Sequence, residues 1–278
     1  MLEIYDKVCI ECSRKTTRSY STSFSLGTRF LVKKFRDPVY AVYGFVRFAD
    51  EIVDTFHDYN KAQLFASFKE DTWKAIRDGI SMNPILHSFQ QVYHKYHFEP
   101  YLVETFLHSM EMDLEKQKYS KESYEKYILG SAEVVGLMCL KIFTEGDQES
   151  YEKLKPAAMK LGAAFQKINF LRDLNADFNE LGRSYFPGLR MVHFNDEVKR
   201  EIEREIAADF KAGYEGILSL PKDSRFGVYV AYVYYQRLFR KIQGIPSQRI
   251  LEERIRIPNR RKFTLFIQSY LRHSLNLL

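Results

Sequence analysis

The sequence predicts an all-α fold in a single domain that covers residues 1–278. Only 13 Gly and 8 Pro interrupt the chain of 278 residues, which favours long helices over many short strands. Strand-like alternation is limited to Phe226–Tyr235, whose length and continuation into Gln236–Ile242 favour a buried helix instead. Because no low-complexity linker and no internal repeat divides the chain, we expect one domain.

The helices are predicted in order from caps, breakers and apolar spacing. The first begins at Asp37-Pro38, because a carboxylate can cap a helix and proline suits its first position, and it runs to about Thr55. Pro156 is expected to end a later helix and to let a new one begin near Ala157. The later predicted helices are Tyr101–Glu115, Lys121–Phe143, Glu149–Asn179, Asp196–Leu218, Phe226–Gln243 and Lys262–Leu277.

The charge of the chain limits its partners. A net charge of +6 suits nucleic acid, an anionic membrane surface or small phosphorylated ligands. The basic stretch Arg249–Lys262 is interrupted by Glu252 and Glu253, so we expect no nucleic-acid partner.

Cys9 and Cys12 have the spacing of a metal knuckle, but they lack the second pair that a structural zinc site needs.

The location is predicted from charged and apolar runs. Charges throughout Met1–Arg14 argue against a signal peptide, and we expect a cytoplasmic protein. The longest near-apolar runs, Val134–Phe143 and Phe226–Tyr235, are shorter than the ~20 residues of a membrane span. The amphipathic segment Lys262–Leu278 predicts transient contact with a membrane surface, although a helix that closes the core has the same pattern.

Two predicted helices carry polar stripes. Arg47, Asp50 and Asp54, with Asp58 as a further candidate, recur at spacings of three and four residues, which places them on one helical face. The later helix repeats this spacing with four polar residues in an apolar context: Gln166, Asn169, Asp173 and Asp177. Buried carboxylates need cations or hydrogen-bond donors nearby, so both stripes indicate function rather than a solvated surface.

These residue types suit a hard cation and a diphosphate. Mg²⁺ prefers oxygen ligands and is usually completed by water and substrate phosphates. Facing pairs of aspartates can therefore hold Mg²⁺ ions that bridge a diphosphate. Three arginines, Arg47, Arg172 and Arg183, can add charge-assisted hydrogen bonds to it.

The stretches around the two stripes, Phe45–Asp54 and Gln166–Asp177, resemble the signature motifs of the squalene/phytoene synthase family. Tyr20–Phe24 resembles the N-terminal serine segment of that family, and Gly182–Pro187 resembles its Arg-x-Tyr element. The resemblance extends over most of the chain. Tyr235 and Arg254 are similar to a late pair of residues that contact diphosphate.

The resemblance implies an isoprenoid-synthase-type helical bundle around a central cavity. It implies a Mg²⁺-dependent prenyltransferase, with Mn²⁺ as an alternative ion, that condenses two prenyl diphosphates head to head through a cyclopropyl intermediate. The implied metal ligands are Asp50, Asp54, Asn169, Asp173 and Asp177. The implied catalytic residues are the same four aspartates with Arg47 and Arg172. The implied substrate-binding residues are Ser21, Ser23, Phe24, Gln166, Asn169, Arg183, Tyr185, Tyr235 and Arg254.

The chain departs from the family pattern at two positions. Leu129 replaces a tyrosine that many members have, and Glu133 replaces a glycine. The missing phenol puts the identity of the proton-accepting base in doubt. No Gly-x-Gly occurs, so the glycine fingerprint of a dinucleotide-binding site is absent. The sequence leaves open whether the enzyme uses a reductant. It also leaves open the oligomeric state.

The favoured product is phytoene, formed from two C20 diphosphates in carotenoid biosynthesis. In the family, bulky side chains at the floor of the pocket are understood to limit chain length; here Gly27 and Thr28 are small, and Tyr40, expected deeper in the cavity, is of intermediate bulk. The alternatives are a C30 synthase that makes squalene or dehydrosqualene, and a class I terpene cyclase. An inactive relative that serves as an assembly factor is a third, although all four aspartates are present.

Overall fold

The computed structural model describes residues 1–114, 119–179, 183, 185–187, 189 and 193–257, and every regular element within them is helical. The all-α prediction is thus confirmed. The elements are α1 (Leu2–Tyr20), α2 (Thr22–Arg29), α3 (Lys33–Asp54), α4 (Lys61–Asp78), α5 (Pro84–Lys95), α6 (Pro100–Met112), α7 (Lys121–Ile128), the π-helical turn η1 (Leu129–Glu133), α8 (Val134–Thr144), α9 (Gln148–Asn179), α10 (Asp196–Ser219), α11 (Lys222–Gln243) and α12 (Ser247–Glu252).

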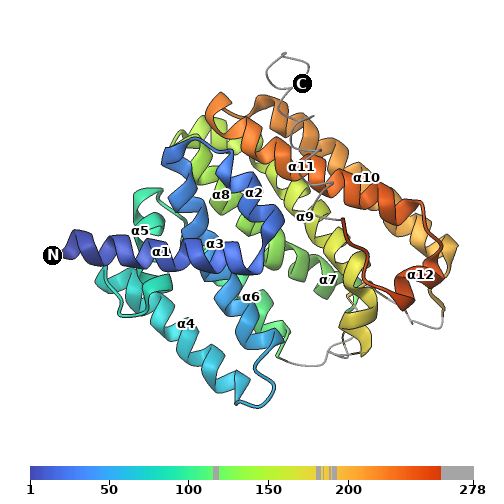
Figure 1. The fold of residues 1–278 in the computed structure, drawn as a ribbon, viewed down its shortest axis with the longest axis horizontal. Helices are drawn as coiled ribbons and strands as arrows, with labels where there is room; N and C mark the ends of the chain where they lie inside the picture. Colours follow the sequence, from blue (N-terminus) through green and yellow to red (C-terminus); the bar gives the residue numbers. More distant parts are fainter. Residues whose placement is uncertain (115–118, 180–182, 184, 188, 190–192, 258–278) are drawn as a thin grey trace.

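The helices pack around two clusters of buried apolar side chains. Helices α1, α4 and α5 lie at the end of the molecule that holds the N-terminus, and α10–α12 lie at the opposite end (Figure 1). Phe45 of α3 stacks on Phe89 with ring centroids 3.9 Å apart in the first cluster. In the second, Phe170 of α9 stacks on Tyr185 at 4.1 Å. Helix α3 packs in the first cluster, whereas α9 begins in the first and reaches the second, where its polar stripe lies.

The predicted start of the first polar helix is wrong. Helix α3 begins at Lys33, and Pro38 lies inside it. Asp37 does not cap the helix, because its carboxylate accepts hydrogen bonds of 2.8 and 2.6 Å from Arg14 of α1. Phe35 is fully buried and packs on Phe143, so burial of the first turn extends the helix ahead of the proline.

The predicted break at Pro156 is also wrong. Helix α9 continues from Gln148 to Asn179 with Pro156 inside it. Proline removes one helical hydrogen bond, but Tyr151 and Leu154 before it and Ala163 after it are all buried. Tertiary packing on both sides holds the helix together across the proline.

Some helices outside the prediction have clear local signals. Asn60 caps α4 by accepting a hydrogen bond from the Gln63 amide, and Gly79 ends it with a left-handed φ of 69°. Asn83 caps α5, which begins with Pro84. The predicted helix Lys262–Leu277 lies outside the described residues.

One continuous helical stretch, Lys121–Thr144, is long and apolar enough to cross a membrane by length and composition alone. It combines α7, η1 and α8. Of its most apolar window, 67% is buried inside the protein, as in the core helix of a folded domain. We therefore assign the stretch to the core.

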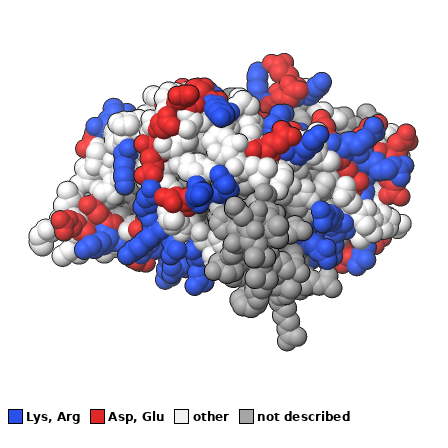
Figure 2. Space-filling view, turned by 90° about the horizontal axis from the view of Figure 1, so that it is seen from above, with Lys and Arg blue, Asp and Glu red and all other residues white. Residues whose placement is uncertain are grey.

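Charged side chains are mixed on the face shown in Figure 2. Lys and Arg side chains form several groups there, with acidic and uncharged side chains between them. The positive charge on this face is therefore divided among separate patches.

Candidate active site

The first polar stripe occupies the second half of α3. Arg47, Asp50 and Asp54 share its face, whereas Asp58 lies beyond the end of the helix in an exposed turn. Asp58 is thus not part of the stripe, and its inclusion was wrong. The Arg47 guanidinium forms an ion pair with Glu51 and lies 4.4 Å from the centre of the Tyr20 ring. Its buried Nε has no hydrogen-bond partner among the described residues.

The second stripe lies on α9 and gathers residues from the end of the chain. Tyr235 of α11 donates a hydrogen bond of 3.3 Å to Asn169 Oδ1. Asp173 is held between two arginines, since Arg172 Nε donates to it at 2.9 Å and Arg254 Nε lies 2.6 Å from it. Arg172, Tyr235 and Arg254 therefore all contact this stripe.

Arg183 connects the two stripes. Its Nη1 donates a hydrogen bond of 2.6 Å to Asp54 Oδ1. Its backbone amide donates a bond of 2.9 Å to the main-chain oxygen of Asp177. The end of α3 and the end of α9 are thus held together by one residue, which is 4% exposed.

Two carboxyl groups at this junction, those of Asp50 and Asp177, have raised pKa values. Burial raises the pKa of Asp50 to about 7, and the neighbouring charges of Asp54 and Asp113 add to the effect. Burial and the charges of Asp173 and Asp54 raise the pKa of Asp177 to about 8. Neither carboxylate accepts a hydrogen bond that would lower its pKa within the part of the chain described. Asp50 and Asp177 thus have no ion-pair partner among the described residues, although the charges of Arg47 and Arg183 oppose the two pKa shifts.

A divalent cation fits this deficit. Among the described residues, no three His, Cys, Asp or Glu side chains converge on a preformed metal centre. Mg²⁺ does not require one, because it is commonly held by one or two carboxylates and completed by water and phosphate oxygens. Asp50 and Asp177, whose pKa values are raised by burial and by nearby carboxylates, match that pattern together with their neighbours Asp54 and Asp173.

A further buried carboxylate belongs to this region and was not predicted from the sequence. Asp113, at the end of α6, is 6% exposed and accepts hydrogen bonds from the hydroxyls of Tyr127 (2.5 Å), Tyr185 (3.2 Å) and Tyr119 (3.3 Å). Burial raises its pKa to about 6, although Arg183 and Tyr127 oppose the shift. No periodic pattern marks Asp113, because its partners come from other segments.

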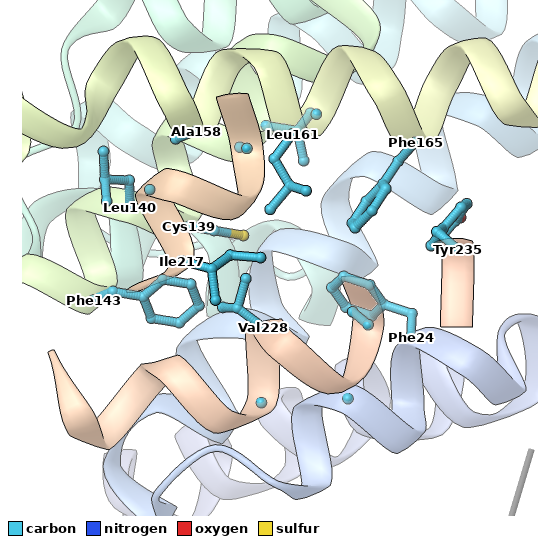
Figure 3. Close-up of a pocket in the computed structure, with 18 of the residues that line it drawn as sticks. Phe24, Cys139, Leu140, Phe143, Ala158, Leu161, Phe165, Ile217, Val228 and Tyr235 are labelled. Atoms are coloured by element: carbon cyan, nitrogen blue, oxygen red, sulfur yellow. The ribbon is translucent and has the colours of Figure 1, made fainter. Parts of the chain in front are cut away.

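An apolar cavity of about 270 Å³ extends from the second stripe into the core. Phe24, Phe165 and Tyr235 line the end of the cavity next to Asn169, and Leu140, Phe143 and Ile217 line the opposite end (Figure 3). Much of the wall between them consists of small residues: Gly27, Thr28, Ala132, Gly136, Ala157, Ala158, Gly162, Gly213, Gly216, Gly227 and Ala231. The volume is near the lower end of the range for ligand pockets, so a larger side chain at any of these positions would reduce the length of ligand that fits.

The N-terminal serine segment borders this cavity. Ser21 caps α2, because its Oγ accepts a hydrogen bond of 3.1 Å from the Phe24 amide. Ser23, Phe24 and Thr28 line the cavity, as does Gln166 of the second stripe. Tyr40 is buried but lies outside the cavity lining, so its predicted place in the cavity is wrong.

The two departures from the family pattern are the first and last residues of the π-helical turn η1. Leu129 begins η1 and packs against the first core cluster. Glu133 ends η1, and burial raises its pKa while the charges of Lys160 and Lys167 oppose the shift. Between them, Ser131 lines the cavity with a buried hydroxyl that has no partner among the described residues. Such turns are frequent at functional sites.

Several known proteins are similar to this chain in sequence and in fold. The squalene/phytoene synthase family matches residues 17–261. The phytoene synthase of Arthrospira platensis is 26% identical over 259 residues, which cover 84% of this chain and 83% of that protein. The 4,4'-diapophytoene synthase of Staphylococcus haemolyticus is 27% identical over 199 residues, covering 69% of this chain and 67% of that protein. Matched plant phytoene synthases are longer, and the chain spans 60–64% of their length.

A crystal structure of a dehydrosqualene synthase superposes with a TM-score of 0.81 at 21% identity, covering 98% of both chains. This similarity establishes the isoprenoid-synthase fold. Since the family match includes both polar stripes and most of the chain, the protein belongs to the squalene/phytoene synthase family of prenyltransferase-type synthases.

Proposed function

We propose that the protein condenses two prenyl diphosphates head to head, with two C20 diphosphates giving phytoene as the favoured reaction. The observation that carries this proposal is an apolar cavity that begins at the second stripe, where Gln166 lines it and the Tyr235 hydroxyl bonds to Asn169. Arg183 holds that stripe to the first one. A prenyl diphosphate has a charged head and a long apolar tail, and this arrangement offers a separate environment to each. The four aspartates and the family membership both support it.

We assign the diphosphate to the polar end of the cavity. Asp50 and Asp54, together with Asn169, Asp173 and Asp177, would hold Mg²⁺ there, with Mn²⁺ as the alternative ion. When bound, the ions would neutralise charge on the diphosphate and assist its departure. Arg47 has an unpaired buried Nε and can donate a hydrogen bond to a departing oxygen.

The cavity protects and orients the prenyl chain. The rings of Phe24, Phe165 and Tyr235 lie at the end where positive charge develops, and aromatic faces attract cations. Phe165 and Tyr235 are stacked at 4.1 Å, and the Tyr235 hydroxyl is held by Asn169, so the position of this wall is set from two sides. The apolar lining farther in excludes water, which would otherwise trap the cation.

The chain length of the substrate is proposed from the cavity wall. Thr28 leaves room where a large aromatic residue would close the cavity, which supports a C20 tail. Gly27 lines the cavity as well but packs closely against Gly227 of α11. A C30 product from C15 diphosphate is the second candidate, because one relative is a 4,4'-diapophytoene synthase.

We propose further that the enzyme is cytoplasmic and touches a membrane surface transiently through the segment 262–278, since its substrates and products carry long apolar chains.

One incubation tests the reaction and the chain length together. The protein is supplied with Mg²⁺ and either C15 or C20 diphosphate, with and without NADPH, and the hydrocarbon is identified by mass spectrometry. A C40 product without NADPH is expected from the C20 substrate. Efficient use of C15 with no use of C20 would replace phytoene by a C30 product. No hydrocarbon from either substrate would contradict the condensation itself.

A further inference from the structure

A network of buried polar side chains lies behind Asp54. Its centre is Asp113, whose side chain is 3% exposed, whereas the Asp54 side chain is 38% exposed. The Asp113 carboxylate is surrounded by the hydroxyls of Tyr119, Tyr127 and Tyr185. A buried carboxylate of this kind is costly unless a cation balances it. The cation in contact with it is Arg183, whose Nε lies 3.7 Å from Asp113 Oδ1. The Lys61 ammonium, which donates a hydrogen bond of 2.9 Å to the Val53 carbonyl, adds a further positive charge near both residues, so the Asp113 charge is needed all the more.

The Arg183 guanidinium is fixed between the two carboxylates. Nη2 donates hydrogen bonds to the main-chain oxygens of Asp113 (2.8 Å) and Val53 (3.1 Å). Nε lies 3.7 Å from Asp113 Oδ1, and Nη1 donates to Asp54 Oδ1 at 2.6 Å. Because the two main-chain bonds anchor the guanidinium to the ends of α3 and α6, it cannot follow the movements of the Asp54 side chain.

This arrangement affects the charge that Asp54 offers to a cation. Arg183 contacts Oδ1, and Oδ2 forms no hydrogen bond within the described residues, which leaves Oδ2 available to a cation. A fixed guanidinium at this distance would orient Asp54 but would also cancel its charge and repel a metal ion. Asp113 places a second negative charge on the other side of Arg183. The Asp113–Arg183 pair is then close to neutral, and Asp54 keeps its attraction for a cation.

We propose that Asp113 is a positioning residue that neutralises Arg183, so that Arg183 can orient Asp54 without repelling the divalent cation. This inference rests on the proposed function of Asp54 as a metal ligand. It predicts opposite effects on two ligands when the Asp113 charge is removed. A cation should bind less tightly, and an anion should bind at least as tightly as before.

The test measures binding rather than turnover. Mn²⁺ affinity is determined by electron paramagnetic resonance, and inorganic pyrophosphate affinity is determined by calorimetry in the presence of EDTA, both at pH 8. Asp113→Asn keeps the shape of the side chain and should raise the Mn²⁺ dissociation constant about 10- to 100-fold, the usual effect of losing a residue behind a metal ligand. Metal-free pyrophosphate should bind as tightly as to wild type or more tightly. Damage to the structure would weaken both ligands.

Two further variants isolate the charge. Tyr119→Phe removes the longest hydrogen bond to Asp113 but no charge, so it should bind Mn²⁺ like wild type. In an Arg183→Gln background there is no guanidinium to neutralise, so adding Asp113→Asn should change Mn²⁺ affinity far less than it does in wild type. This double variant also leaves neither member of the buried pair without its partner, so it should fold. If Asp113→Asn alone fails to fold, Mn²⁺ binding is compared between Arg183→Gln and the double variant, which should bind about equally; a much weaker double variant would overturn the proposal.

The outcomes distinguish a failure of the proposed metal site from a failure of the proposed role of Asp113. If wild type binds no Mn²⁺, the proposed metal site itself is wrong. If wild type binds Mn²⁺ and Asp113→Asn binds it equally well, only the role of Asp113 is overturned. A parallel loss of Mn²⁺ and pyrophosphate binding, or an equal cost of Asp113→Asn with and without Arg183, would also overturn it.

Discussion

Arg183 and Asp54 form an ion pair of 2.6 Å although 129 positions separate them in the sequence. The pair joins the end of the first polar stripe to the segment that follows the second. Because the Arg183 amide also bonds to Asp177, one residue sets the spacing of the two stripes.

The aspartates of the stripes should be needed for turnover but not for folding. Asp50→Asn is expected to lower turnover with Mg²⁺ by a factor of about 100 or more, since it removes a proposed metal ligand and keeps its shape. Its melting temperature without metal should be unchanged or higher, because a carboxylate repelled by its neighbours is removed. Asp58→Asn is the matched control; it lies in the exposed turn beyond α3 and should have full activity. Near-normal turnover in Asp50→Asn and Asp173→Asn would contradict the proposed site.

Metal affinity should rise with pH across the neutral range. The pKa values of Asp50 and Asp177 are about 7 and about 8. These carboxyls therefore stay protonated in the folded state at pH values where the same groups in the unfolded chain are ionised. The folded state binds more protons between about pH 4 and 8, so its metal-free stability should fall as pH rises through that window. Mn²⁺ titrations and thermal melts at pH 6, 7, 8 and 9 test both trends. A metal-free protein that becomes more stable from pH 6 to 8 would contradict this account.

A bulky residue at position 28 should shorten the accepted substrate. Thr28 lines the cavity and is 3% exposed, so Thr28→Phe would occupy space that a C20 tail needs and should shift the preference toward C15 diphosphate. Thr28→Val, which keeps the volume, should leave the preference unchanged. Competition between the two substrates, with products separated by chromatography, measures the ratio. Gly27→Phe is less suitable, because even a Cβ there would lie 3.3 Å from the Gly227 carbonyl on α11.

Glycine at position 130 should be required for packing of the π-helical turn. A Cβ on Gly130 would lie 2.5 Å from both the Thr105 carbonyl oxygen and the Ser109 Cβ of α6. Gly130→Ala should therefore lower the free energy of unfolding by about 1–3 kcal/mol, as overpacking does. Gly244→Ala is the control, since its Cβ would meet its neighbours at 3.6 Å or more, and it should be neutral or slightly stabilising. Urea denaturation of both variants provides the comparison.

Much of the site could be predicted from local spacing. The positions of Asp50 and Asp54 on one helical face, and of Asn169, Asp173 and Asp177 on another, follow from helical periodicity, which the chain itself displays. The places of Pro38 and Pro156 could not be predicted in this way. Both prolines lie inside helices because distant apolar residues pack on either side, and that packing outweighs a lost hydrogen bond.

The sequence by itself determined the helical class, the two polar stripes and, through its motifs, the family, because periodicity and residue type are local properties of the chain. Only the tertiary structure decided that Asp113 belongs with the stripes, that Asp58 and Tyr40 do not line the site, and that Arg183 lies between two carboxylates. Burial, charge balance and pKa depend on neighbours from separate segments. Their proximity arises when the helices pack, and no spacing within one segment encodes it.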